Sequence, residues 1–463
     1  MSRADIVRNV LLGLFAAAAA ACGESGGSDP SDGGTDAIGS DGGDDEGSTS
    51  PPVTTARPDM GPEKIAPDPD AGTPTGPVTP DEVYYVARDF NTGATGYFYN
   101  SGDGALSALP EAFSYNAIFR TQQPSVTQPS GRLCVLERSG FTDVNYQSNV
   151  TCFERNAEGV WDNAWTDRGD DAALGSIVGG RMILGRRAGN FDMAVRSFTD
   201  SDWGYLPLST FGEVIAIDLD SAEERHIPVA DHGCMAPTAA VEAEDMIFTL
   251  AESEDGTGRV CVINPSTDQV ESDEATPLMT SRPRMGVKAG GEILVASPGS
   301  LDDFSAPGIR AVERFDPLTW ESRGVLWESI DLCAGLESCN NAYPFHISVD
   351  ESLGMGAVTL IVPTGDPEIV DYHVKLFTLP DEETGTPYEL GAVIFSQTKA
   401  PGSPGGIEGT RFINGADLLI AHRLGIHKYN MTTGELTEVA GVDADGRYPS
   451  QAPVVLTASG DEE

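Results

Sequence analysis

The segment Lys428-Tyr429-Asn430-Met431-Thr432-Thr433-Gly434 contains the motif that decides the fold. A strand pattern ends at Asn430, and a Thr and a Gly follow before the next strand pattern begins. An Asn or Asp at the first position can cap the turn through its own side chain, and glycine supplies the left-handed conformation that closes a hairpin. The segment therefore predicts a strand, a capped turn and a second strand.

The same design recurs along the chain. Four more copies occupy residues 215–221, 261–267, 313–319 and 378–385, and two degenerate copies occur at Asn100 and at residues 156–159. The seven turns are about 55 residues apart on average. A period near 50 in an all-β chain is typical of a radial repeat of four-stranded blades.

Short alternating apolar runs between these turns predict an all-β domain over residues 81–463, because no helical apolar period accompanies them. The Asp-x-x-Thr-Gly turn resembles that of YVTN-like and quinoprotein-like β-propellers. This resemblance implies a β-propeller, and the spacing favours seven four-stranded blades, with six or eight as alternatives. Two β-sandwich domains are the competing fold, but they would give no repeat through the whole chain.

The resemblance does not extend to a quinone cofactor. Quinoprotein propellers carry a tryptophan at a fixed offset after the Thr-Gly of each blade. Here Trp320 and Trp327 follow one turn only, at a different spacing.

The N-terminus has the pattern of an export signal. Residues 1–21 contain Arg3, Arg8 and a twelve-residue apolar run that is too short to cross a bilayer. The following Ala-Ala-Ala-Cys22-Gly23 resembles a bacterial lipobox, which implies a signal peptide over 1–21 and lipidation of Cys22. With Gly23 after the cysteine, the resemblance also implies anchoring to the outer membrane of the cell envelope.

Residues 22–80 read as a linker between this anchor and the domain. Residues 23–80 include 12 Gly, 10 Pro and 12 acidic residues and have no aromatic residue. Such a composition cannot bury enough apolar surface to offset its ordering entropy, so we expect a disordered tether.

The chain is strongly acidic, with 28 Lys+Arg against 72 Asp+Glu and a net charge of -44. The leader contributes +1 and the tether -10, which leaves -35 for residues 81–463. This charge excludes nucleic acid as a partner, because such binding depends on Lys and Arg neutralising phosphates. Adaptation to salt explains the acidity, and calcium held by carboxylates is the alternative, with Asp443 and Asp445 as the best local fragment.

Six cysteines remain once Cys22 is assigned to lipid. An even number in an exported protein predicts disulfides. Since sequence neighbours lie in the same or adjacent blades, we favour the pairs Cys134–Cys152, Cys234–Cys261 and Cys333–Cys339.

No catalytic motif is present, which favours a ligand-binding or scaffold module over an enzyme. Trp161, Trp165 and Trp203 are the candidates for a binding face. The alternative is a propeller-class hydrolase or lyase with a divalent cation at the channel mouth, held by Asp or Glu and by His346 or His422. Each of these histidines has two interpretations, a channel-facing residue of an inner strand or an ordinary hydrogen-bonded strand histidine. A purely structural surface protein is a third interpretation.

Overall fold

The computed structural model describes the backbone of residues 82–89, 93–100 and 104–108, of short strands between 121 and 177, and of most residues from 193 to 441, with the longest internal gaps at 300–307 and 400–405. It also describes residues 448–449 and 454–456. All of them belong to one contact unit, 58–463. The signal peptide, Cys22 and the tether lie outside the described residues. No helix in the described part is long and apolar enough to cross a membrane.

The described strands form seven antiparallel sheets. Three sheets contain the earliest strands. The first consists of β1 (Glu82–Asp89), β2 (Gly93–Asn100), β3 (Leu106–Ala108), β31 (Tyr448–Pro449) and β32 (Val454–Leu456), and the second of β4 (Thr121–Gln122), β5 (Val126–Thr127), β6 (Leu133–Ser139), β7 (Gln147–Arg155), β8 (Trp161–Asn163) and β9 (Gly175–Ile177). The third consists of β10 (Ala194–Ser197), β11 (Asp202–Leu208), β12 (Glu213–Asp218) and β13 (Glu224–Pro228).

The other four sheets follow in chain order. They are β14 (Ala236–Ala243), β15 (Met246–Glu252), β16 (Thr257–Asn264), β17 (Gln269–Val270) and β18 (Thr276–Ser281); β19 (Met285–Ala289), β20 (Glu292–Ser297), β21 (Ala311–Asp316) and β22 (Glu321–Glu328); β23 (Tyr343–Asp350), β24 (Met355–Pro363), β25 (Val370–Thr378) and β26 (Glu389–Lys399); and β27 (Ile407–Ile413), β28 (Asp417–His422), β29 (Gly425–Asn430) and β30 (Leu436–Ala440). Two short helical segments, η4 (Ala230–His232) and α2 (Ser329–Leu332), lie in connections.

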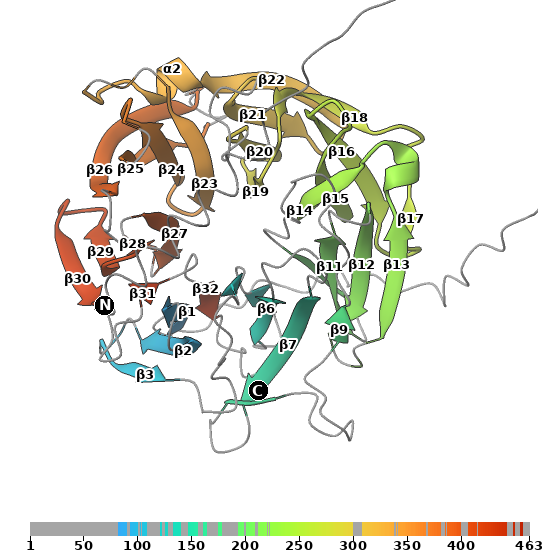
Figure 1. The fold of residues 1–463 in the computed structure, drawn as a ribbon, viewed down its shortest axis with the longest axis horizontal. Coiled ribbons are helices and arrows are strands. Elements are labelled where there is room, and N and C mark those ends of the chain that lie inside the picture. The colour runs from blue at the N-terminus through green and yellow to red at the C-terminus, as the bar shows by residue number, and fades with distance from the viewer. Residues whose placement is uncertain are drawn as a thin grey trace, which may run out of the picture. The chain divides into compact units, whose positions relative to one another are not determined.

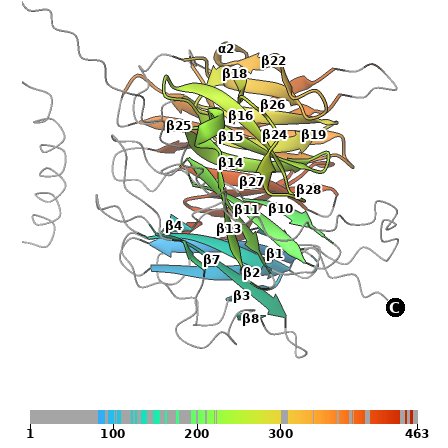
Figure 2. The ribbon, with the colours of Figure 1, turned by 90° about the vertical axis from the view of Figure 1, so that its right-hand side faces the viewer.

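The sheets are arranged around a common centre, with β14, β19, β23 and β27 on the inside (Figure 1). Figure 2 shows the same sheets from the side. Each of these inner strands contacts the inner strand of the next sheet. This arrangement confirms the predicted all-β fold and the β-propeller. Seven sheets agree with the seven turns, and the number of blades stays a prediction because residues 109–120 and 178–192 lie outside the described part.

The turns have the chemistry that the sequence predicts. Asn430 Oδ1 accepts the backbone N–H groups of Thr432 and Thr433 at 3.0 and 2.8 Å. The first residues of the turns at Asn100, Asp218, Asn264 and Asp316 accept in the same way. Each of these turns joins two consecutive paired strands, as β29 and β30 are here.

The residue after the Ser/Thr of these turns is left-handed wherever it is described. It is Gly434 at φ 70° and Gly385 at φ 70°, but Asp268 at φ 56° and Trp320 at φ 60° in two other copies. The local turn geometry is therefore kept even where glycine has been replaced.

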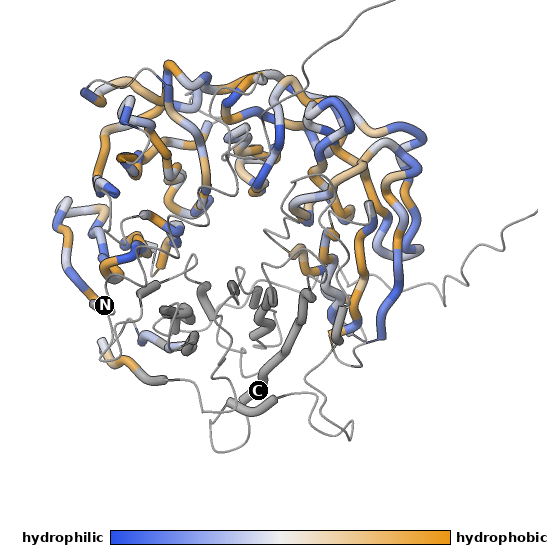
Figure 3. The backbone as a smooth tube through the Cα atoms, in the orientation of Figure 1, coloured by the Kyte–Doolittle hydropathy of each residue, from blue (hydrophilic) through white to orange (hydrophobic). Residues whose placement is uncertain are grey.

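Neighbouring sheets pack face to face, so the strands between them are apolar on both sides. Every residue of β28 is buried, and one cluster joins Leu294 and Trp327 of one sheet to Leu360 and Phe377 of the next. Figure 3 shows hydrophobic residues along the strands and many hydrophilic ones in the peripheral turns.

The chain closes the ring with strands from both ends of the domain. β1 pairs on one edge with β2 and on the other with β31 and β32. This sheet therefore combines strands that are more than 350 positions apart in the chain.

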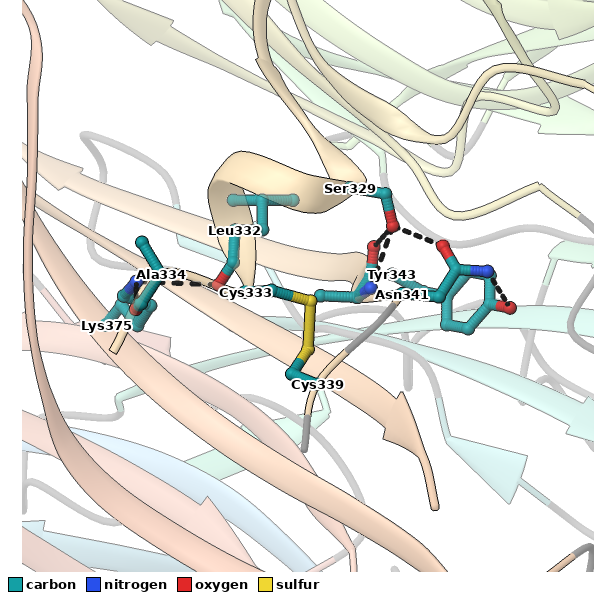
Figure 4. Close-up of a disulfide and its surroundings, with 9 residues drawn as sticks. Ser329, Leu332, Cys333, Ala334, Cys339, Asn341, Tyr343 and Lys375 are labelled. Carbon is teal, nitrogen blue, oxygen red and sulfur yellow. Dashed lines mark hydrogen bonds between the residues drawn. A yellow bond between two sulfur atoms is a disulfide. The ribbon is translucent and has the colours of Figure 1, made fainter. Parts of the chain in front are cut away.

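Two predicted disulfides are present, Cys234–Cys261 and Cys333–Cys339. The second closes the loop after α2, and Figure 4 shows Lys375 beside it. The buried Lys375 ammonium donates to the Ala334 carbonyl at 2.6 Å, so the charge is held by the C-terminal end of this short helix.

The third predicted pair is consistent with the strand register. β6 and β7 place Cys134 directly opposite Cys152. Their side chains lie outside the described part, so this disulfide stays a prediction.

Candidate ligand-binding site at the inner strands

Several arginines and several aromatic or imidazole side chains lie on or next to the inner strands β19, β23 and β27. We call this group the mouth cluster, and its members are Arg284, Phe345, His346, Tyr372, Arg411 and Arg423. Arg284 immediately precedes β19, and Arg423 lies in the turn between β28 and β29. Three consecutive sheets therefore contribute to one place.

His346 lies on the inner strand β23, as the sequence predicts, and is 8% exposed. Its Nδ1 accepts the Thr410 N–H of β27 at 3.5 Å, so the ring carries its proton on Nε2. Burial, reinforced by Arg411 and Arg284, lowers the pKa of His346 to about 3. The imidazole is neutral at physiological pH and presents an N–H donor.

Two arginines lie next to the neighbours of this imidazole. The Arg284 guanidinium lies 3.8 Å from the centre of the Phe345 ring, next to His346 in the chain. Arg411 directly follows Thr410, the residue that bonds to His346, and its side chain is exposed. Both charges contribute to the lowered pKa of His346.

Arg423 and Tyr372 extend the cluster toward β25. Arg423 Nε donates to Glu408 Oε1 at 2.8 Å, and its backbone N–H donates to Gly406 at 2.9 Å. Burial raises the pKa of Tyr372, and Arg423 and Arg284 oppose that shift while Glu408 adds to it. A methyl group on Gly406 would lie 3.3 Å from Arg423 Nε and 3.7 Å from the Tyr372 ring, so glycine permits this close packing.

His422 does not lie on an inner strand. It is the last residue of β28, the second strand of its sheet. Its Nδ1 accepts from the Leu424 N–H at 3.3 Å and from Gln397 Nε2 at 3.3 Å, and its Nε2 lies 2.6 Å from His427 Nδ1. The Gln397 orientation is set because its Oε1 accepts the Gly406 N–H. His422 Nε2 therefore carries the proton and donates to His427, which leaves it no lone pair for a metal.

Trp203 is not part of an exposed binding face. It is 3% exposed, its Nε1 donates to Ser201 at 2.8 Å, and the Arg225 guanidinium lies over its ring at 4.5 Å. That interpretation of Trp203 is wrong, because both faces of β11 are buried and Trp203 belongs to a core cluster shared with the next sheet. The Trp161 side chain and Trp165 lie outside the described part.

A metal site has no support among the described residues, where no three His, Cys, Asp or Glu side chains are grouped to hold an ion. Asp443 and Asp445 lie outside the described residues, so calcium at that fragment stays an expectation.

A second concave surface lies between β17 and the β21–β22 turn. It is a groove of about 730 Å³ whose lining includes Trp320 and the carboxylates of Glu271, Asp273, Glu274 and Glu321. Its acidity matches the rest of the chain, in contrast to the mouth cluster.

Sequence reasoning missed the arginines of the mouth cluster. The sequence contains one indication of them. The chain is acidic and has only five lysines, so an arginine at the start of an inner strand is a candidate functional residue. The sheets that carry these arginines are brought together by the ring, and the spacing of the arginines along the sequence does not predict this.

No family model matches the chain, and no curated protein matches it in sequence. Among solved structures, a putative 6-phosphogluconolactonase from Bacteroides uniformis has 14% identity and a TM-score of 0.46, with 81% of this chain and 98% of that chain covered. The Pseudomonas aeruginosa periplasmic gluconolactonase PpgL has 10% identity and a TM-score of 0.44, with 81% and 99% covered.

The β-propeller domain of the trilobed protease from Pyrococcus furiosus has 10% identity and a TM-score of 0.38, with 74% and 99% covered. These similarities are too distant to inform on function. The class of this protein, a β-propeller, follows from its own sheets and ring closure.

Proposed function

We propose that this protein is an exported, lipid-anchored β-propeller that binds a small molecule at the mouth cluster. The observation that carries the proposal is that Arg284 lies over the ring of Phe345, beside His346 in the chain, and that His346 bonds to the N–H of Thr410, beside Arg411. A propeller is a rigid ring, and side chains at its centre bind ligands without needing chemistry of their own. The leader and Cys22 supply the export and the anchor, and the tether holds the domain away from the membrane.

A binding role accounts better for the cluster than catalysis does. The imidazole of His346 is buried and neutral with a very low pKa, so it is a poor general base near pH 7. Arginines stay charged and recognise groups by hydrogen bonding, which suits a receptor site.

The hydrolase alternative has one described feature in its favour. Ser396 Oγ lies 2.8 Å from His373 Nδ1, and Asp371 lies two residues from His373 on β25. The pair lies on an exposed sheet surface, and His373 directly follows Tyr372 in the chain. Hydrolysis of a fluorogenic ester that is lost in Ser396→Ala and kept in Thr437→Ala, at an exposed position of β30, would favour this alternative.

Hydrogen exchange tests the binding proposal on the purified full-length protein. Panels of organic acids, neutral sugars and polyamines are added in turn, and amide protection is measured by mass spectrometry. We expect at least one panel member to protect residues 343–346, 406–411 and 422–425. Protection confined to the Trp320 groove, or unchanged exchange at these three segments with every panel, would show that the mouth cluster is not the binding site.

A further inference from the structure

A series of hydrogen bonds crosses the boundary between the sheet β23–β26 and the sheet β27–β30. The Gly406 N–H donates to Gln397 Oε1 at 3.0 Å, and Gln397 Nε2 donates to His422 Nδ1 at 3.3 Å. His422 Nε2 then donates to His427 Nδ1 at 2.6 Å. Gln397 belongs to β26, whereas His422 and His427 belong to β28 and β29. We call these four residues the histidine link, because they join side chains of two neighbouring sheets.

The two imidazole rings are packed in place. His422 is 2% exposed, and its ring centre lies 4.8 Å from that of the half-buried His427. The Phe395 ring of β26 lies 4.9 Å from His422 and 5.5 Å from His427. A different pairing of the ring nitrogens would therefore require an imidazole to rotate against Phe395.

The direction of the donors leaves no position for an added proton. A proton on His422 Nδ1 would face the N–H groups of Gln397 and Leu424, which donate to that nitrogen. A proton on His427 Nδ1 would face the N–H of His422, and His427 Nε2 already carries the one proton of a neutral ring. Turning the Gln397 amide over would set its NH₂ group against the Gly406 N–H. Every protonation therefore breaks a hydrogen bond of the link.

Ion pairs near the link add little net charge to it. Arg423 follows His422 in the chain and pairs with Glu408 of β27 at 2.8 Å. Lys428 follows His427 and pairs with Asp417 of β28 at 3.6 Å. Neither pair supplies a free carboxylate that would stabilise a charged imidazole.

The adjacent strands carry other titratable groups. Tyr372 of β25 lies opposite Gln397 as a neutral phenol, and Lys399 at the end of β26 is a cation. Glu438 of β30 lies opposite His427, but its side chain is exposed, so water and salt screen its charge. The surroundings therefore do not offset the hydrogen bond that a proton would break.

We propose that the histidine link is an acid-sensitive latch between these two sheets. At neutral pH it holds β26 against β28 and β29, and it opens when one of its imidazoles takes up a proton. Opening releases the Gly406 N–H just before the inner strand β27, so acid loosens this boundary ahead of the rest of the ring. The latch does not require a ligand at the mouth cluster.

The sign of the pH dependence follows from proton binding in the two states. In the closed latch, burial and His427 lower the pKa of His422 to about 4. In the open latch the exposed rings have ordinary pKa values near 6.5. The open state therefore binds more protons between these values, and it gains population as the pH falls through this range.

Hydrogen exchange of the full-length protein at pH 6.5 and pH 5.0, without ligand and corrected for the intrinsic rate, tests the latch. We expect the protection of residues 406–408 and 422–427 to fall by about tenfold or more. Residues 236–264 are the internal reference, since β14, β15 and β16 contain no histidine. An equal loss in the reference strands, or no loss at the latch, would overturn the proposal.

Variants assign the loss to the two rings. His422→Gln and His427→Gln each remove one titrating group and keep an amide that can donate and accept, so we expect the loss to shrink to about threefold or less. His226→Gln is the control, because its side chain is half-exposed on β13 and pairs with Glu213 in another sheet. A loss of the wild-type size in both latch variants would overturn the assignment.

The onset of the loss in the wild type decides the matter if a latch variant does not fold. Histidines released by opening take up protons below about pH 6.5, whereas ordinary carboxylates do so mostly below about pH 5. We therefore expect protection at residues 406–408 and 422–427 to decline steadily from pH 6.5 downward. An onset only below pH 5 would assign the opening to carboxylates and overturn the latch.

Discussion

His422 shows how the fold sets the charge of a single side chain. Burial, reinforced by the neighbouring His427, lowers the pKa of His422 to about 4, against about 6.5 in the unfolded chain. The folded protein therefore binds fewer protons than the unfolded chain between these two values. The stability that His422 contributes is fully present above pH 6.5 and is lost as the pH falls toward 4.

Urea unfolding between pH 7.0 and 5.5 measures this loss before most carboxylates titrate. We expect His422→Gln to reduce the dependence of the unfolding free energy on pH, by up to about 1.4 kcal/mol per pH unit. His226→Gln is the control, because the His226 side chain is half-exposed and pairs with Glu213. Parallel pH profiles for the wild type and His422→Gln would contradict the neutral hydrogen-bonded pair.

At the scale of an element, the capped turn between β29 and β30 is the unit that repeats. Gly434 has φ 70°, and a methyl group there would meet nothing closer than the Tyr429 hydroxyl at 3.5 Å. Substitution to alanine therefore tests the backbone conformation alone. We expect Gly434→Ala to lower the unfolding free energy by about 1 kcal/mol, measured by chemical denaturation.

The control for this turn is Thr432→Ala at an exposed neighbouring position. It keeps the Asn430 cap, since Asn430 accepts from backbone N–H groups of the turn. If both variants are equally stable, the left-handed residue does not limit the hairpin.

The β6–β7 hairpin carries a second prediction at this scale. Opposed residues in an antiparallel pair have Cα atoms about 4.5 to 5.5 Å apart, which a disulfide can span. Since Cys134 and Cys152 are opposed, we expect them to be bonded in the exported protein. Non-reducing peptide mapping should recover this linked pair, and free thiols at both positions would refute it.

At the scale of the whole molecule, ring closure depends on β31 and β32. They pair with β1, which joins the two ends of the domain through hydrogen bonds. Removing residues 448–463 leaves one edge of β1 unpaired and opens the ring. We expect a large loss of stability, read as a melting temperature lower by at least about 10 °C or as failure to fold.

The control for closure removes only residues 457–463, which follow β32. We expect that shorter chain to melt with the full-length protein. Equal melting of the chain without residues 448–463 would mean that the terminal strands do not close the ring.

The features that depend on neighbours in the chain could be predicted from the sequence. Strand alternation, the Asn430 cap and the left-handed Gly434 are local, because each turn satisfies its own backbone. The pairing of Cys333 with Cys339 is equally local, since six residues separate them. The regular spacing of such turns was enough to predict a propeller.

Only the tertiary structure decided the candidate site and the burial of particular side chains. Arg284, His346 and Arg411 lie on or directly before the inner strands of three different sheets, and the ring brings these strands into contact. Trp203, predicted at an exposed face, is buried because its side of β11 packs against the next sheet. Packing between sheets joins residues that are far apart in the chain, and no local pattern encodes which of them will meet at the centre.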